Sequence, residues 1–169
     1  MAEIQDSHCS IRIRAATATD MRAVIALVNG AFAVETFLEG TRTDESSITE
    51  MLGRGEFLVG EDQSGRIIAS VFVEIRDNPE STSGYLGMLA VDPARQGEGL
   101  GRTLAEAAED HARVHGCKQM DIDVLSLRTE LIPFYSKLGY IETGTALFHP
   151  SRPLRAGVEC HSIEMSKTL

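Results

Sequence analysis

The sequence is short of basic residues and of long apolar runs, and both shortages exclude classes of protein. Lys and Arg number 16 against 25 Asp and Glu, which gives a formal net charge of -9. Nucleic-acid binding needs a basic face for the phosphates, so nucleic acid is not expected as a partner. No apolar run approaches the roughly 20 residues of a membrane helix, so no membrane partner is expected. The acidic excess favours a cationic substrate such as an amine.

Cysteine is also scarce. Cys9, Cys117 and Cys160 stand far apart, without the spacing of a metal site, so no metal is expected. An odd, scattered set favours reduced thiols and a cytoplasmic protein. The N-terminus lacks the apolar core of a signal peptide. No repeat, low-complexity segment or long linker divides the chain, so residues 1–169 are predicted to form a single domain.

Apolar periodicity and turn residues predict the order β-α-α-β-β-β-α-β-α-β-β. The expected strands are 11–15, 57–60 paired with 66–75, 85–91, 117–126, 140–144 and 158–165. One helix is expected after Thr17 or Thr19, and three more are expected at 44–52, at 100–115 and from 129 to its end at Gly139. The segment 77–84 is predicted to be a polar loop. This order predicts an α/β (α+β) fold, with a mixed central sheet of about seven strands flanked by about four helices.

The helix expected at 100–115 is amphipathic. Its apolar positions recur at i, i+4, i+7 and i+8, at Leu100, Leu104, Ala107 and Ala108. Its charged residues are expected to face away from the core: Arg102, Glu106, Glu109 and Arg113.

A glycine turn precedes this helix. Gly97, Gly99 and Gly101 alternate between an apolar strand and the helix start, where unpaired N–H groups and the helix dipole favour an anion such as a phosphate. A mononucleotide P-loop would need a lysine after the glycines, and none follows. A dinucleotide fingerprint would need a third glycine where Arg102 stands. Both nucleotide interpretations are therefore poor.

The pattern Gln96-x-x-Gly99-x-Gly101 after "LAVDP", together with "PFYSKLGY" at 133–140, resembles the GNAT superfamily of N-acetyltransferases. The resemblance covers about residues 11–165. It implies a GNAT-like fold in which two parallel strands splay apart, here 85–91 and 118–124. It also implies acetyl-CoA as cosubstrate, with its pyrophosphate on the turn amides and its pantetheine arm beside the strand. The implied cofactor-binding residues are Leu89, Ala90, Val91, Gln96, Gly97, Glu98, Gly99, Leu100, Gly101 and Arg102.

Acetyl transfer to an amine needs a neutral amine, donors for the developing oxyanion and a proton for the leaving thiolate. The resemblance implies Tyr135 as general acid, with a core aromatic as the alternative, and the Leu89 amide as oxyanion donor. No acid lies between Tyr85 and Val91, so the general base stays open among Glu35, Glu74, Asp123 and a water relay. Each of these carboxylates can also be read as a solvated surface group.

Arg128 stands where many relatives carry an asparagine that contacts the cofactor, so that contact is absent or replaced. In the family, the substrate is set by the first two helices and the last loop, here 21–52 and 148–157. Phe32 and Glu35, with Phe37 and Glu39, could receive a cationic amine there, or could serve packing and the surface.

The predicted function is acetyl-CoA-dependent acetylation of a small-molecule or peptide amine by direct attack in a ternary complex. A non-catalytic sensor that only binds CoA or an acyl-CoA is the alternative, and an unrelated phosphate-binding domain is a third. The identity of the amine stays open, and a homodimer is an option because many relatives pair.

Overall fold

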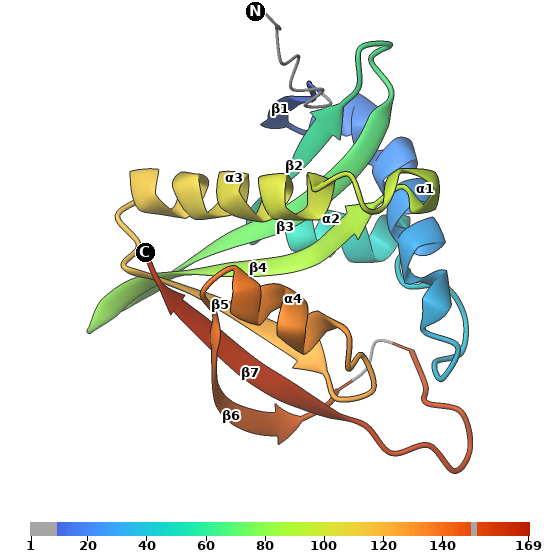
Figure 1. The fold of residues 1–169 in the computed structure, drawn as a ribbon, viewed down its shortest axis with the longest axis vertical. Helices are drawn as coiled ribbons and strands as arrows, with labels where there is room; N and C mark the ends of the chain where they lie inside the picture. The colour runs from blue at the N-terminus through green and yellow to red at the C-terminus, as the bar shows by residue number, and fades with distance from the viewer. Residues whose placement is uncertain (1–9, 150–151) are drawn as a thin grey trace, which may run out of the picture.

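The structure is a computed structural model that describes residues 10–149 and 152–169, so Cys9 lies outside the described residues. Its seven strands form one sheet in the order β1-β2-β3-β4-β5-β7-β6 (Figure 1). The strands are β1 Arg12–Ala15, β2 Gly55–Glu61, β3 Ile67–Asn78, β4 Ser81–Val91, β5 Gln119–Leu125, β6 Ile141–Leu147 and β7 His161–Thr168. The helices are α1 Met21–Ala31, α2 Glu45–Leu52, α3 Leu100–Val114 and α4 Leu131–Lys137. The predicted element order is confirmed.

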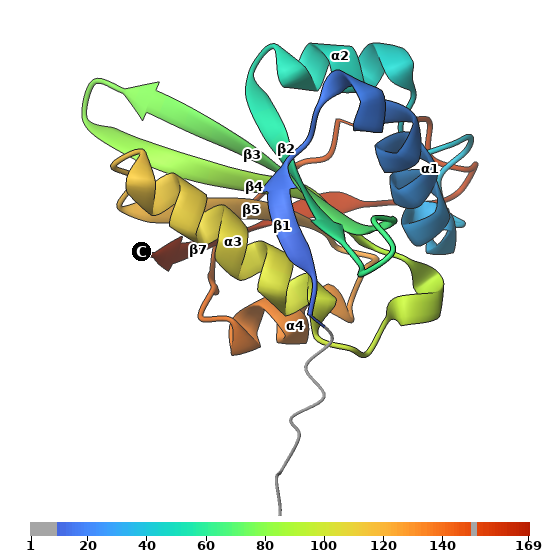
Figure 2. The same cartoon turned by 90° about the horizontal axis from the view of Figure 1, so that it is seen from above.

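The four helices cover both faces of the sheet. Figure 2 shows α1 and α2 on one face and α3 and α4 on the other. The larger core cluster joins the inner side of α3 and α4 to β3, β4 and β5, with Leu104, Met120 and Tyr140 at most 2% exposed. The smaller cluster places Val24 and Val28 of α1 against Phe57 and Phe72. Among the described residues, no helix is long and apolar enough to cross a membrane.

Two predictions about these elements are wrong. The polar segment 77–84 was expected to be a loop, but β3 and β4 continue through it and pair from Asn78–Ser81 to Ala69–Val91. The hydrogen bonds between two long antiparallel strands outweigh the turn-forming character of its residues. Glu109 of α3 was expected to face solvent, but it is 2% exposed. It accepts bonds from Lys167 Nζ at 2.7 Å and Tyr140 Oη at 3.1 Å, and these partners allow burial of its charge.

Strand β4 has two irregularities that matter for the site. Ser70 pairs with Ala90 and Phe72 with Gly87, so Val71 alone faces both Met88 and Leu89 across a β-bulge. On its other edge, β4 runs parallel to β5 and pairs at Gly84–Met120 and Tyr85–Asp121, before the strands part. The predicted splayed pair of parallel strands is therefore confirmed.

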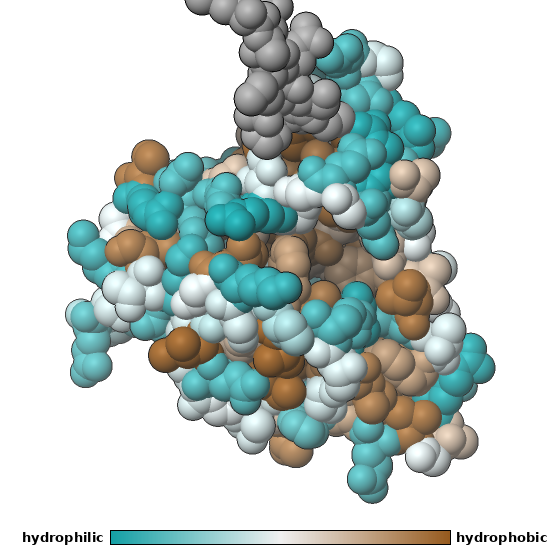
Figure 3. Space-filling view, viewed as in Figure 1, coloured by the Kyte–Doolittle hydropathy of each residue, from teal (hydrophilic) through white to brown (hydrophobic). Residues whose placement is uncertain are grey.

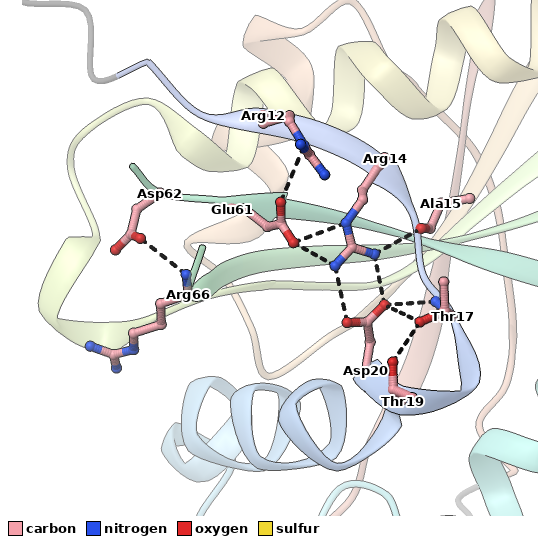
Figure 4. A network of polar contacts seen from close by, with 9 residues as sticks. All are labelled: Arg12, Arg14, Ala15, Thr17, Thr19, Asp20, Glu61, Asp62 and Arg66. Carbon is pink, nitrogen blue, oxygen red and sulfur yellow. Dashed lines mark hydrogen bonds and ion pairs between the residues drawn. The ribbon is translucent and has the colours of Figure 1, made fainter. Parts of the chain in front are cut away.

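A polar network fastens β1 and the start of α1 to β2, away from this splayed region. Arg14 Nε donates to Glu61 Oε1 at 2.9 Å, and its Nη1 donates to Asp20 Oδ2 at 2.7 Å (Figure 4). The Thr17 N–H also donates to Asp20 Oδ2 at 2.7 Å. These bonds hold the pKa of Asp20 well below its usual value, the Arg14 guanidinium being the main cause.

Candidate active site

A cavity of about 950 Å³ opens where β4 and β5 part. Its walls come from the glycine turn, the first turn of α3, α4, the end of α1 with the segment after it, and the chain around β6 and β7. Figure 3 shows a hollow in the face drawn in Figure 1, with apolar residues inside it and hydrophilic residues along much of its rim. The cavity therefore joins both predicted motifs and both segments expected to contact the substrate.

The glycine turn has the backbone that its sequence predicts. Gly97 and Gly99 have φ of +88° and +78°, a left-handed conformation that strains other residues. A Cβ on either would meet nothing within 4 Å, so their outer side is open to a ligand. Gly101 differs from them, because a Cβ there would make an ordinary van der Waals contact with the Phe134 ring at 3.4 Å. A turn of this shape aims N–H groups outward at the start of the 15-residue helix α3, which favours an anion.

The predicted cofactor residues fall into two groups. Those that line the cavity are Leu89, Val91, Gln96, Gly97, Gly99, Leu100, Gly101 and Arg102. Ala90 is 1% exposed and packs in the smaller core cluster. Glu98 accepts hydrogen bonds from the Arg95 guanidinium at 2.7 and 2.8 Å. Ala90 and Glu98 are therefore candidates for ligand contacts through their backbone groups and not through their side chains.

The bulge in β4 places a strained residue at the cavity wall. Met88 has φ of +51°, the one positive φ of a non-glycine residue in the described part of the chain. Such strain costs about 1–3 kcal/mol and gathers at functional sites. The register of β3 with β4 skips Met88 and Leu89, and both line the cavity. The bulge therefore lies at the cavity wall, where the resemblance implies a ligand contact at Leu89.

Tyr135 of α4 also lines the cavity. It is 7% exposed, and its ring packs edge-on against Phe134 and Tyr140, with centroid distances of 4.9 and 5.6 Å. Burial raises the pKa of Tyr135 above its ordinary value, so the phenol stays protonated at neutral pH. Tyr135 is thus a core aromatic that also reaches the wall of the cavity with a protonated phenol.

The three carboxylates considered as general base lie in different surroundings. Glu35 is 4% exposed, so its interpretation as a solvated carboxylate is wrong. Arg128 Nη1 and Arg152 Nη2 bind its two oxygens at 2.9 and 2.5 Å. Glu74 on β3 lies 3.5 Å from the guanidinium groups of two arginines, Arg54 and Arg76. Within the described residues, Asp123 has no ion pair, and it lines the cavity from β5.

Asp123 and Tyr85 influence each other across the gap between β4 and β5. Burial raises the pKa of Asp123 above its ordinary value, while Arg76 and the Tyr85 phenol partly oppose this. Burial and the nearby charge of Asp123 raise the pKa of Tyr85 to about 12. A carboxylate with a raised pKa is a better base near neutral pH than one with the ordinary value. Asp123 is nevertheless an exposed residue of β5, as its interpretation as a solvated carboxylate expects. Sequence reasoning missed Tyr85, which looked like an ordinary apolar strand residue.

Sequence reasoning also missed an arginine cluster at the α1 end of the cavity. Arg42, Arg128 and Arg152 gather around Glu35, and the first two have guanidinium centres 5.1 and 5.7 Å from the Phe32 ring centroid. Phe32 and Glu35 are therefore brought together, but as the support of a cationic group. No local motif marks this cluster, because its members come from three distant segments.

Comparison with known proteins agrees with this geometry. The profile of the acetyltransferase (GNAT) family matches residues 21–140. A mycothiol acetyltransferase of Propionibacterium freudenreichii is 27% identical over 99 residues, which are 58% of this chain and 32% of that protein. The chain thus spans about a third of the length of that curated relative.

Solved structures share the fold at low identity. The ribosomal-protein-S18-alanine N-acetyltransferase of Escherichia coli superposes with a TM-score of 0.72 at 21% identity, over 94% of each chain. The protein yncA of Salmonella typhimurium, solved with its cofactor acetyl-CoA, gives 0.72 at 22%, over 95% of this chain and 94% of the other.

Proposed function

The chain belongs to the acetyltransferase (GNAT) family, and we propose that it moves the acetyl group of acetyl-CoA to a primary amine by direct attack in a ternary complex. The family membership is established by the profile match, and the activity, the acceptor and the mechanism are what the proposal adds. The observation that carries it is one cavity that unites the glycine turn, the bulged β4 and Tyr135. The free thiols of Cys117 and Cys160 fit the predicted cytoplasmic setting.

The chain's own residues fit acetyl-CoA. The outward side of Gly97 and Gly99 and the first N–H groups of α3 would hold the pyrophosphate. The unpaired edge of β4 beyond Tyr85 would pair with the amides of the pantetheine arm. When bound, acetyl-CoA supplies the thioester that a neutral amine attacks.

Three residues would then act on the reacting atoms. The Leu89 N–H, placed by the bulge at Met88, would donate to the oxygen on which negative charge develops. Tyr135, held protonated by burial, would give a proton to the leaving sulfur. Asp123 would take the proton that the amine must lose, since Glu35 and Glu74 are held by arginines.

A cofactor screen is the first test of this function. We expect acetyl-CoA and CoA to raise the melting temperature, while ATP and NAD at the same concentration do not. A ligand at 100 times its Kd adds about 2.7 kcal/mol to the native state. Stabilisation by ATP or NAD alone would remove the acetyltransferase proposal and favour another phosphate ligand.

Turnover of amines separates the enzyme from a sensor. We expect Tyr135→Phe to lower kcat about 10²- to 10⁴-fold with little change in the Kd of acetyl-CoA, because a general acid acts in the chemical step. Tyr140→Phe is the matched control, since Tyr140 lies next to Tyr135 but bonds Glu109 in the core. Tight binding of acetyl-CoA without turnover of any amine would indicate the sensor instead.

A further inference from the structure

The charges at the α1 end of the cavity do not balance. Arg128 is bound by Glu35 and by Glu130, whose Oε1 lies 2.6 Å from Arg128 Nε. Arg152 is bound by Glu35 and also donates to the Gly40 carbonyl at 3.2 Å. Three guanidinium groups therefore face two carboxylates. The remaining positive charge belongs to Arg42.

Arg42 has no hydrogen bond or ion pair within the described residues, and its Nε is fully buried without a partner. Its guanidinium lies over the Phe32 ring and lines the cavity. Burial lowers the pKa of Arg42 below its ordinary value, which shows that its surroundings disfavour the charge. An arginine without a partner in such a place is destabilising unless an anion binds it.

The chemistry of the guanidinium group identifies the missing partner. Its planar set of N–H donors matches a carboxylate or a phosphoryl group, and such charge-assisted bonds are strong. Asp123, beside Tyr85, brings a negative charge to another wall of the same cavity. The cavity thus offers a site for a cation and a site for an anion.

We infer that the acceptor is a small primary amine that carries its own anionic group, a carboxylate or a phosphoryl group, which Arg42 binds while Asp123 faces the amine. This inference rests on the proposed function and names the substrate class of that site. It adds an anionic group to the cationic substrate, such as an amine, that the net charge of -9 favours. The field near the site is set by a few buried groups, whereas most of the acidic excess lies elsewhere on the molecule.

Matched amines test the inference directly. The probes are amino acids with small, apolar and acidic side chains, the carboxamides of the same amino acids, and the corresponding 1-aminoalkylphosphonates. We expect kcat/KM to be at least tenfold higher for one anionic set than for the carboxamides. Comparison of the amino acids with the aminoalkylphosphonates shows whether Arg42 binds a carboxylate or a phosphonate. Equal or faster acetylation of the carboxamides would overturn the inference.

Variants of Arg42 then locate the anion site. We expect Arg42→Gln to lower kcat/KM for the anionic amine about 10- to 100-fold, mainly through KM, and to leave the carboxamide and the Kd of acetyl-CoA nearly unchanged. Arg42→Lys should recover part of the loss, because it keeps the charge without the planar donor set. Arg22→Gln is the control, since Arg22 is an exposed arginine of α1 outside the cavity wall. An equal loss for both amines would overturn the assignment.

A stability measurement does not depend on activity. We expect Arg42→Met to leave the melting temperature of the free protein unchanged or higher, because it removes a charge without a partner but keeps the contact with Phe32. A clear loss of stability would mean that Arg42 is a structural residue, which contradicts the inference. If acetyl-CoA binds but no amine of any class is acetylated, the proposed function fails. If amines are acetylated without preference for an anion, the inference alone fails.

Discussion

The two ends of the cavity are built by different means. At the glycine turn and the bulge of β4, the ligand groups are backbone N–H groups, and their placement depends on a few consecutive residues such as Gly97, Gly99 and Met88. At the α1 end, the groups are side chains of Glu35, Arg42, Arg128 and Arg152, which the fold gathers from distant segments. A backbone site can therefore be identified from a short motif, whereas a side-chain cluster cannot.

The largest expected effect tests whether the α1 end depends on its buried ion pairs. Replacing Glu35 by Gln leaves Arg128 and Arg152 buried without their shared carboxylate, so we expect a loss of about 3–5 kcal/mol of unfolding free energy. Urea denaturation would measure it. Glu39→Gln, an exposed position four residues on, should change stability by less than about 0.5 kcal/mol. A loss below 1 kcal/mol for Glu35→Gln would show that the cluster does not depend on this carboxylate.

The next effect concerns the general base. We expect Asp123→Asn to lower kcat by about 10²-fold or more, because the amine must lose a proton. Asp121→Asn is the control: Asp121 lies on the same strand but accepts from Ser166 at 2.6 Å and is not part of the cavity wall. Equal rates for the Asp123 variant and the wild type would assign the base to water.

The pH dependence of the reaction rate is a second test of Asp123 as general base. Since burial raises the pKa of Asp123, activity should fall with decreasing pH through a midpoint above the usual aspartate value of about 3.9. The rate falls on the acid side because the protonated carboxyl cannot accept a proton. Initial rates across pH under saturating acetyl-CoA would show this limb. A midpoint at or below the ordinary value would contradict the role.

The backbone site can be tested with a pair of glycines that carry the same strain. Gly99 and Gly65 have φ of +78° and +80°, and a Cβ on either meets nothing within 4 Å. We expect Gly99→Ala and Gly65→Ala each to lower stability by about 1–2 kcal/mol. Only Gly99→Ala should weaken acetyl-CoA in a binding titration, because Gly65 lies in the β2–β3 turn. Equal affinities in the two variants would separate the glycine turn from cofactor binding.

The smallest effect is expected from Arg102, on the exposed side of α3. Its Nε lies 2.9 Å from Glu106 Oε1, and both side chains are more than half exposed. Arg102→Gln should change the unfolding free energy by less than about 0.5 kcal/mol. It should weaken acetyl-CoA about two- to fivefold by removing one positive charge near the turn. A hundredfold loss would mean that this end of the cavity also depends on a side chain.

The predictions from the sequence succeed for features set by neighbouring residues and fail for features set by residues distant in the sequence. The element order and the turn were predicted from apolar periodicity and turn residues. The splayed strands were expected because two local motifs resemble those of the family. The β3–β4 arm at 77–84 was missed, since cross-strand pairing outweighs local turn preference there. Glu109 was placed on the wrong face, because its partners Lys167 and Tyr140 are 58 and 31 residues away.

By itself, the sequence determined the α/β fold, the acyltransferase family and the backbone turn suited to a phosphate, since these depend on neighbours within a few residues. The tertiary structure alone decided that Glu35 is a buried counter-ion and that Asp123 lines the cavity. It also decided that Arg42 has no hydrogen bond or ion pair among the residues that the structure describes. The physical reason is that the energy of a charge depends on burial and on the charges around it in space. Both arise only when segments such as 31–42, 119–128 and 152–155 are folded together.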